Sequence, residues 1–345
     1  MPAAFITGAV GFIGGYTVRE FIERGWHVFA LVHRKTSSEL DSLAASGRVT
    51  IIHGDLREFS SVEDELNKAL AERGVSLDAI VHCAGRASDV GRREEFRRTN
   101  FEPIQRLCEL TERMNVPRFV FVSTTDVYGM RDFHGERESD LPLMNNARNP
   151  YPEFKIASEE WIRKTLPPER YSIIRPAAVW GVGDPTLSPR IVSFLKSSPW
   201  IINFGRWRGE NRWPLAHVRN VATAIFLAST LSEGAGSAIN VIDSERTTID
   251  EFYRILAAIY LPSKKLKSVT LPLWAGKVFG SIVSLISNAS NLDRPFTDPS
   301  IYAVYSVSCD LDFGNETLLH LLDLAGRKLL TRDEGVEELR ASFKQ

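Results

Sequence analysis

Tyr151 and Lys155 are the two side chains of this sequence best suited, by type and spacing, to acid–base chemistry. They are four residues apart in a stretch whose pattern predicts a helix running to about Leu166, so both lie on one helical face. An ammonium group beside a phenol lowers the pKa of the phenol, as a tyrosine acid or base near neutral pH requires. Pairs at this spacing are also common on helix surfaces, so the rest of the sequence must show whether this pair is catalytic or an ordinary surface pair.

Hydroxyl side chains form a second candidate for chemistry. The apolar run 119–123 predicts a buried strand that ends in Ser123, and Thr124 and Thr125 follow it directly. Because open parallel sheets bind ligands at the carboxyl ends of their strands, we expect these hydroxyls at a ligand-binding edge.

Three glycines near the N-terminus, Gly8, Gly11 and Gly14, lie between a predicted strand at 3–6 and a predicted helix at 12–24. Glycines let the backbone turn tightly, and the free N–H groups at the helix start, around Phe12 and Ile13, can bind a pyrophosphate. The spacing is G-x-x-G-x-x-G rather than G-x-G-x-x-G, and the alternative is a loop that serves only as a tight turn. The flanking strand and helix favour nucleotide binding.

The end of the second predicted strand, 28–32, indicates which dinucleotide fits. His33 and Arg34 follow it, and basic residues at this point pair with a 2′-phosphate, which favours NADP(H) and leaves NAD(H) as the alternative. After the third strand, 49–53, Asp55 and Leu56 are expected beside the adenine, where the carboxylate can accept from the amino group. Asp55 could equally cap the next helix. Ala84 and Gly85, after the fourth strand, are small enough for a cofactor to lie against the backbone.

Strands and helices alternate through the first half of the chain, which predicts an α/β fold of the Rossmann type, a doubly wound parallel sheet. A polar loop is expected at 131–150. After Pro176 the alternation of strands and helices loosens, and from Thr248 the pattern is mostly helical. We predict a dinucleotide-binding domain of residues 1–175 with about 214–245. Residues 176–213 with 246–345 form a smaller, mostly helical substrate lobe.

The composition is that of an ordinary globular protein: of 345 residues, 43% are hydrophobic and 25% charged, and the net charge is −1. We therefore expect no binding to nucleic acid through a global field. Three dispersed cysteines indicate neither disulfides nor a metal site and fit a cytoplasmic protein. The strongly apolar stretch 271–286 has three interpretations: a core helix of the substrate lobe, a lid over an apolar ligand, or a helix at a membrane surface.

Taken together, the sequence resembles the extended short-chain dehydrogenases/reductases, within the NAD(P)-dependent epimerase/dehydratase superfamily. The matching pieces occur in the family's order over about the first 245 residues. They are Thr7-Gly8-x-x-Gly11-Phe12-Ile13-Gly14, Gly54-Asp55-Leu56, His82-x-Ala84-Gly85, Thr99-Asn100, Ser123-Thr124-Thr125-x-Val127-Tyr128-Gly129, Tyr151-x-x-x-Lys155 and Arg175-Pro176-x-x-Val179-x-Gly181.

The resemblance implies roles for these residues. Tyr151 exchanges a proton with the substrate oxygen during hydride transfer, Lys155 lowers its pKa and binds the nicotinamide ribose, and Thr124 polarises the substrate oxygen. Asn100 helps to hold the loop and the cofactor. It also implies a homodimer through the helices at 103–115 and 154–166. Further cofactor contacts are expected from Ser123, Pro176 and Val179.

Two departures bear on the substrate. Ala178 stands where sugar-nucleotide enzymes usually carry asparagine, and Thr124-Thr125-Asp126 replaces the T-D-E of sugar dehydratases. The sequence looks more like the 3β-hydroxysteroid dehydrogenase and dihydroflavonol reductase branch, which predicts an NADP(H)-dependent reductase of a largely apolar carbonyl compound. The alternatives are a nucleotide-sugar epimerase or dehydratase and a non-catalytic dinucleotide sensor.

Two groups of side chains could report on the substrate pocket. Four aromatic residues either wall an apolar pocket or belong to the core: Trp180, Phe204, Trp207 and Trp213. Three arginines either clamp a phosphate or carboxylate, as the sugar-nucleotide alternative requires, or lie in a solvated loop: Arg206, Arg208 and Arg212.

Overall fold

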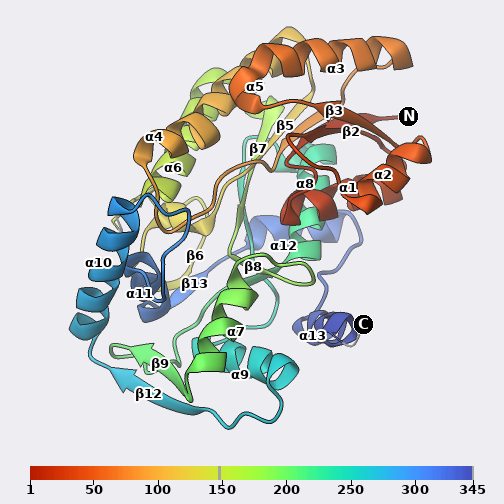
Figure 1. Ribbon diagram of the computed structural model, residues 1–345. Coiled ribbons are helices and arrows are strands. Elements are labelled where there is room, and N and C mark those ends of the chain that lie inside the picture. The colour runs from red at the N-terminus through yellow and green to blue at the C-terminus, as the bar shows by residue number, and fades with distance from the viewer. Residues whose placement is uncertain (147–148, 344–345) are drawn as a thin grey trace.

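A parallel sheet of seven strands forms the centre of the computed structural model, which describes residues 1–146 and 149–343 (Figure 1). In spatial order the strands are β11 (Ala238–Val241), β7 (Tyr171–Pro176), β5 (Arg118–Val122), β4 (Ala79–His82), β1 (Ala3–Thr7), β2 (His27–Val32) and β3 (Val49–His53). The predicted doubly wound parallel sheet is confirmed.

Helices cover both faces of this sheet, which explains why its strands are apolar at almost every position. Ala4 and Ile6 of β1 pack in one core, whereas Ala3 and Phe5 pack in the other. The first face is covered by α1 (Phe12–Glu23), α2 (Ser38–Ala45), α8 (Val218–Thr230) and α12 (Glu316–Leu324). The second face is covered by α3 (Phe59–Arg73), α5 (Glu102–Arg113) and α6 (Pro150–Thr165).

The second lobe surrounds a third core that includes Trp180, Trp213 and Phe252. Its helices are α7 (Leu187–Ser197), α9 (Ile249–Tyr260), α10 (Leu273–Ala289), α11 (Ile301–Ser308) and α13 (Arg332–Phe343). Three two-stranded ribbons complete it, pairing β8 (Ala178–Trp180) with β10 (Leu215–His217), β9 (Trp200–Phe204) with β12 (Lys267–Leu271), and β6 (Phe133–Glu136) with β13 (Leu311–Phe313). Short turns lie at α4 (Arg93–Phe96), η1 (Leu56–Glu58), η2 (Arg97–Phe101), η3 (Thr125–Tyr128), η4 (Pro168–Arg170) and η5 (Ser232–Gly234).

Two contacts between distant segments differ from the sequence-based expectations. The expected loop at 131–150 contains β6, which pairs with β13 from the far end of the chain. In addition, α12 belongs to the region assigned to the substrate lobe, yet Leu318 and Leu321 pack against the sheet core. Both contacts join segments far apart in the sequence, which local pattern does not reveal.

The predicted dimer helices at 103–115 and 154–166 correspond to α5 and α6, which pack side by side in Figure 1. The homodimer itself stays a prediction.

The apolar stretch 271–286 forms the end of β12 and most of α10 at the edge of the molecule (Figure 1). Its buried positions on α10 are mostly small, including Gly276, Gly280 and Ser284, whereas Trp274 and Leu285 are each 70% exposed. The interpretation as a core helix is therefore wrong. Within residues 1–146 and 149–343, no helix combines the length and the hydropathy needed to cross a membrane.

Candidate active site

The strand order creates a crevice between the carboxyl ends of β1 and β4. From β1 the chain proceeds outward to β2 and β3, then crosses to β4 on the other side and proceeds outward to β5 and β7. Open parallel sheets bind their ligands at such a reversal of strand order. The glycine-rich turn after β1 lies at this crevice and leads into α1.

Close packing explains the glycines of this turn. Gly8 has φ +70°, and a Cβ added to it would lie 2.7 Å from the Ala84 nitrogen after β4. A Cβ on Gly14 would lie 2.0 Å from the Gly8 carbonyl oxygen. Gly11 is the N-cap of α1, and within the described residues no side chain caps this helix, so its first N–H groups can take an anion. The turn therefore fits the pyrophosphate of a dinucleotide, and Phe12 and Ile13 begin the helix beside it.

Around the predicted adenosine end, Asp55 is engaged by neighbours within the chain. Its Oδ1 accepts from the Arg57 N–H at 2.9 Å, which caps the short turn that begins at Leu56. The hydrogen bond from the Arg57 guanidinium lowers the pKa of Asp55 to about 2, and His33 Nε2 lies 3.1 Å from Oδ2. Capping is thus the role that the geometry shows, while adenine binding stays a prediction. Arg34 is exposed at the end of β2.

Tyr151 and Lys155 lie in the first turns of α6, directly beside the crevice. The Asn149 side chain caps the helix by accepting from the Tyr151 N–H at 2.8 Å. The buried Lys155 ammonium donates to the Val122 carbonyl at 2.6 Å and lies 5.9 Å from the centroid of the Tyr151 ring. It also approaches Gly85, where an added Cβ would lie 3.7 Å from Lys155 Nζ. The structure therefore brings the acid–base pair to the ends of β4 and β5.

The electrostatics of this pair differ from the expectation. Burial lowers the pKa of Lys155 to about 8. Burial and the nearby Asp126 carboxylate raise the pKa of Tyr151, and only a hydrogen bond with Thr124 lowers it. The expected lowering of the Tyr151 pKa by Lys155 is not seen, because the ammonium points to the Val122 carbonyl. Thr124, by contrast, lies beside the phenol as a substrate-polarising hydroxyl would.

Asn100 holds the loop after β4. It lies in η2, a π-helical turn, and such turns are frequent at functional sites. Its Oδ1 accepts from the Arg86 N–H at 2.8 Å, and its Nδ2 donates to the Arg86 carbonyl at 2.8 Å. Asn100 thereby fixes the loop that carries Ala84 and Gly85, which fits the loop-holding part of its implied role.

Ser123 is turned away from this constellation. Its hydroxyl donates to Glu159 Oε1 at 2.6 Å, and its N–H donates to the Ile174 carbonyl at 2.6 Å. The side chain is therefore committed to the interior, and the predicted cofactor contact of Ser123 finds no support from it. Pro176 ends β7, and Val179 lies half-buried in β8. Their cofactor contacts stay predictions.

Sequence reasoning did not assign a role to Asp126, Tyr302 or Arg190. The Tyr302 hydroxyl, from α11, donates to the Asp126 carboxylate close to Tyr151. Tyr302 also lines a cavity of about 590 Å³ that is walled mainly by apolar side chains, among them Phe194, Phe204, Trp213, Tyr253 and Phe279. Arg190 lines the same cavity and pairs with Asp89 at 2.9 Å and with Asp298. No local motif marks these residues, because they meet only in three dimensions.

The aromatic residues of the sequence analysis separate into two groups. Phe204 and Trp213 line the cavity. Trp180 is fully buried in the third core and donates to Asp243 at 2.7 Å, and Trp207 donates to Asp132 at 3.0 Å. The pocket interpretation thus holds for Phe204 and Trp213, and the core interpretation holds for Trp180 and also for Trp213. Trp207 is half-buried and belongs to neither group.

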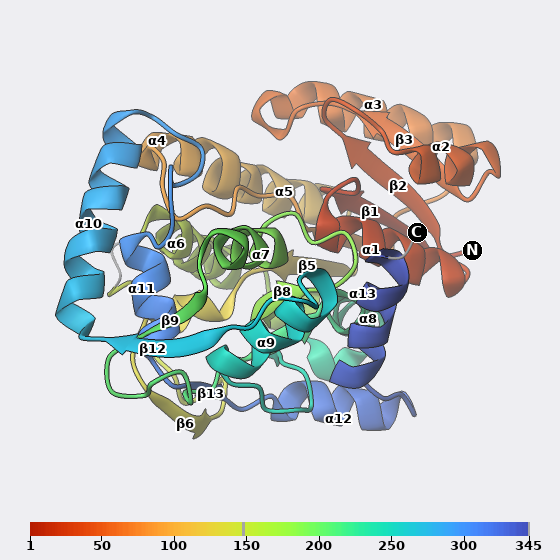
Figure 2. The ribbon, with the colours of Figure 1, turned by 60° about the horizontal axis from the view of Figure 1, so that its bottom comes forward.

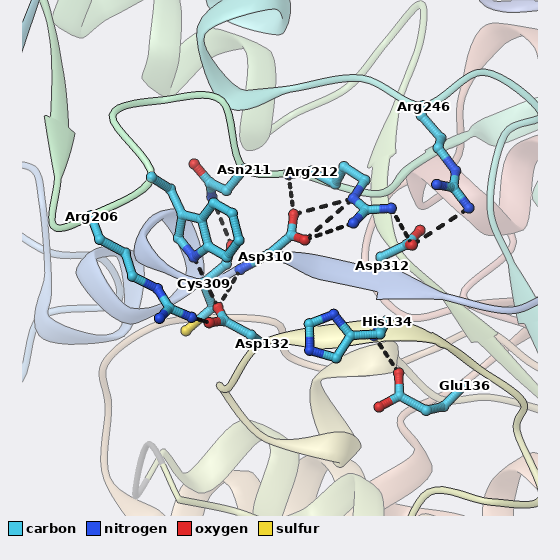
Figure 3. A network of polar contacts seen from close by, with 11 residues as sticks. Asp132, His134, Glu136, Arg206, Asn211, Arg212, Arg246, Cys309, Asp310 and Asp312 are labelled. Carbon is cyan, nitrogen blue, oxygen red and sulfur yellow. Dashed lines mark hydrogen bonds and ion pairs between the residues drawn. The ribbon is translucent and has the colours of Figure 1, made fainter.

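Two of the three arginines form ion pairs within the substrate lobe (Figure 3). Arg206 pairs with Asp132, and Arg212 pairs with Asp312 and with Asp310, the latter at 3.0 Å. Arg208 is exposed. These partners belong to β13 and to the segments before β6 and β13, so Arg206 and Arg212 tie the lobe together there.

A parallel sheet of this order, with a glycine-rich turn at its reversal and a Tyr–Lys pair beside it, defines a Rossmann-type dinucleotide-binding protein. The family model for the NAD dependent epimerase/dehydratase family matches residues 4–241. The chain therefore belongs to this family.

Individual similarities agree with the family. The chain is 28% identical over 268 residues to dTDP-4-dehydro-6-deoxy-D-allose reductase of Streptomyces bikiniensis, covering 74% of this chain and 80% of that protein. It is 26% identical to the decarboxylating sterol-4-alpha-carboxylate 3-dehydrogenase of Mus musculus, covering 98% and 90%. The structure of dTDP-glucose 4,6-dehydratase from Bacillus anthracis in complex with NAD has a TM-score of 0.69 at 18% identity, covering 100% and 97%, and shows the shared fold. The protein is an NAD(P)-dependent oxidoreductase of the extended short-chain dehydrogenase/reductase type.

Proposed function

We propose that the protein interconverts a carbonyl and a hydroxyl group on a largely apolar small molecule, with NADP(H) as the preferred cofactor. The observation that carries this proposal is the cavity of about 590 Å³, whose walls are mainly aliphatic and aromatic. Apolar walls with a few polar groups at one end are typical of sites for apolar ligands. Its polar lining includes Arg190, which pairs with Asp89 and Asp298, and Tyr302, whose hydroxyl donates to Asp126 near Tyr151.

In the reducing direction, the substrate oxygen accepts hydrogen bonds from the Tyr151 phenol and the Thr124 hydroxyl. A nicotinamide held beside Tyr151 and Lys155 would supply the hydride for the carbonyl carbon. Tyr151 gives its proton to the oxygen, which completes the alcohol and leaves a phenolate. The Thr124 hydroxyl stabilises that phenolate, because its hydrogen bond lowers the pKa of Tyr151, while the Lys155 ammonium stays bound to the Val122 carbonyl. Oxidation of the alcohol follows the same steps in reverse.

The cofactor preference rests on the exposed basic residues at the end of β2. Arg34 and Lys35 are exposed there, and a cation at this position pairs with the 2′-phosphate of NADP(H). The mouse relative's name, a sterol dehydrogenase, agrees with an apolar substrate.

A second candidate is the reduction of a keto sugar nucleotide, because the Streptomyces relative is named for that activity. This function needs cations for the diphosphate of the substrate. Arg206 and Arg212 are instead paired with Asp132, Asp310 and Asp312 (Figure 3), so the apolar substrate has the stronger support.

The test is NADPH consumption by the purified protein with sterol and aryl ketones, long-chain aldehydes and 3-oxoacyl compounds, with 4-keto sugar nucleotides for contrast. Tyr151→Phe should lower kcat for the active compound by about 10²–10⁴-fold. The matched control is Tyr253→Phe, which removes another hydroxyl that lines the cavity and should retain turnover. Repeating the assay with NADH and with Arg34→Asp tests the cofactor preference.

Each other outcome points elsewhere. Turnover confined to sugar nucleotides would replace the apolar substrate by the second candidate. Tight NADPH binding without turnover of any compound would favour a dinucleotide sensor. An unchanged NADPH/NADH preference in Arg34→Asp would contradict the role of the basic turn.

A further inference from the structure

The outer face of α10 carries an apolar surface that is open to solvent. Its exposed side chains are Trp274, Val278, Phe279, Ile282, Leu285 and Ile286. They recur at the three- and four-residue spacing of a single helical stripe. On β12, which leads into α10, Leu271 and Val269 are also exposed, as is Trp200 on the paired strand β9. We call this whole surface the α10 face.

Packing explains why these large residues point outward. A Cβ on Gly280 would lie 2.8 Å from the Ile301 backbone nitrogen, and a Cβ on Gly276 would lie 2.6 Å from the Phe204 ring. At Gly276 and Gly280 the inner side of α10 therefore fits only glycine-sized residues against the cavity wall and α11, and Val283 is its largest buried side chain. Because burial in this protein does not require the outer side chains to be apolar, their composition points to something outside the chain.

The segment that carries β12 and α10 has charge of one sign. Residues 255–292 contain four lysines and neither aspartate nor glutamate, although the whole chain has a net charge of −1. Lys265 and Lys267 are exposed at the start of β12. Figures 1 and 2 both show the end of β12 leading into the foot of α10, and Lys267, at the start of β12, is in register with Trp200 of β9. Two exposed tryptophans lie on these elements, Trp200 on β9 and Trp274 on α10. Apolar side chains with tryptophans and nearby lysines match the interface of an anionic bilayer.

The same elements also wall the apolar cavity. Leu271, Ala275, Gly276 and Phe279 line it, and Phe279 is exposed on the α10 face as well. A surface placed against α10 would thus adjoin the cavity wall. A water-soluble protein partner would not require the exposed surface to adjoin the cavity wall.

We propose that the α10 face binds the surface of an anionic lipid bilayer, with α10 lying in the plane of the interface. Docking there places the cavity wall against the lipid, from which an apolar substrate can enter. Binding of the α10 face to a bilayer does not depend on the proposed reaction. Only the idea that substrate enters from the lipid rests on the proposed function.

The experiment is flotation of the intact protein with unilamellar vesicles of phosphatidylcholine and phosphatidylglycerol in equal parts, compared with phosphatidylcholine alone. We expect binding to the anionic vesicles that weakens as salt is added. Leu285→Glu should weaken this binding about tenfold or more. The double variant Lys265→Gln/Lys267→Gln should weaken it roughly fivefold per lysine at low salt. The matched control is Leu319→Glu, which changes a 50% exposed leucine on α12 and should bind like the wild type.

The result that overturns the proposal is absence of flotation by the wild type, or equal flotation of Leu285→Glu and the wild type. Sedimentation gives the competing occupant: a dimer that Leu285→Glu converts to a monomer, without vesicle binding, would assign the α10 face to a second copy of the chain. Flotation requires no turnover, so a failure here leaves the reductase assay untouched, and a failure of that assay leaves flotation interpretable.

Discussion

Helices α6 and α10 have nearly the same length, 16 and 17 residues. Proteins usually bury apolar side chains and expose charged ones, and each of these helices departs from that rule in a different way. α6 buries Lys155 and Glu159 in the interior. α10 buries glycines and serines and exposes its largest apolar side chains. Charged residues are rarely fully buried without partners, and large apolar patches on a surface usually have a function.

The comparison teaches that the two violations are compensated differently. On α6 the buried charges have partners within the chain: Glu159 binds Arg175 and Ser123, and Lys155 binds the Val122 carbonyl. On α10 the compensating partner is, by our proposal, outside the chain. Substitutions on α6 should therefore affect folding and chemistry, whereas outer substitutions on α10 should leave the fold intact.

The largest effect is expected where the compensation on α6 is removed. Arg175 is buried, its Nε lies 3.0 Å from Glu159 Oε1, and its Nη1 donates to the Tyr128 hydroxyl at 2.7 Å. Arg175→Met leaves the Glu159 carboxylate buried without its cation. Breaking such a pair costs about 3–5 kcal/mol in the free energy of unfolding. Urea denaturation followed by circular dichroism measures this loss.

The matched control is Arg163→Met. Arg163 approaches the same carboxylate at 3.8 Å, but its side chain is 38% exposed, so the loss should stay below about 1 kcal/mol. Equal losses for the two variants would show that burial of the pair is not what stabilises α6.

These two helices also show how far the sequence could predict the molecule. The sheet, the glycine-rich turn and the start of α6 follow from local signals, because apolar runs, glycine spacing and a Tyr–Lys pair are visible within short windows. The Arg175–Glu159 pair and the Tyr302–Asp126 contact join residues 16 and 176 positions apart, respectively. Such contacts depend on how β7 and α11 are placed, which no local pattern specifies.

For α10 the sequence pattern does not decide between the three interpretations, and the reason is physical. Periodicity shows that one side of a helix is apolar, but it does not show whether that side meets the protein or its surroundings. The clue lay in the small residues, since Gly276 and Gly280 are four apart and mark the side of closest packing. The four aromatic residues were ambiguous in the same way: Phe204 lines the cavity and Trp180 fills a core.

An intermediate effect is expected on the inner side of α10. Gly280→Val adds atoms where a Cβ alone would lie 2.8 Å from the backbone of Ile301, so α11 must move. Overpacking of this kind costs about 1–3 kcal/mol. The neighbouring Ser281→Val places the same side chain on the exposed side and should change the free energy of unfolding by less than about 0.5 kcal/mol. Chemical denaturation of both variants makes the measurement, and a larger loss for Ser281→Val would reverse the assigned orientation of the helix.

The smallest effect concerns the chemistry at the start of α6. The Asp126 carboxylate raises the pKa of Tyr151, because its negative charge disfavours the phenolate. Asp126→Asn removes that charge, so the pKa of Tyr151 should fall. In alcohol oxidation the phenolate is the base, and the acid limb of the kcat/KM profile should move to lower pH by about 0.5–1 unit.

This shift has a pH window set by Asp126 itself. Burial raises the pKa of Asp126 above its usual value, and the Tyr302 hydroxyl opposes that rise by binding the charged form. Above the pKa of Asp126 the wild type carries the charge and the two profiles differ, whereas below it both side chains are neutral and the difference disappears. Asp140→Asn, at an exposed carboxylate, is the control and should leave the limb in place. A limb that stays fixed in Asp126→Asn, or moves to higher pH, would mean that Asp126 does not set the acidity of Tyr151.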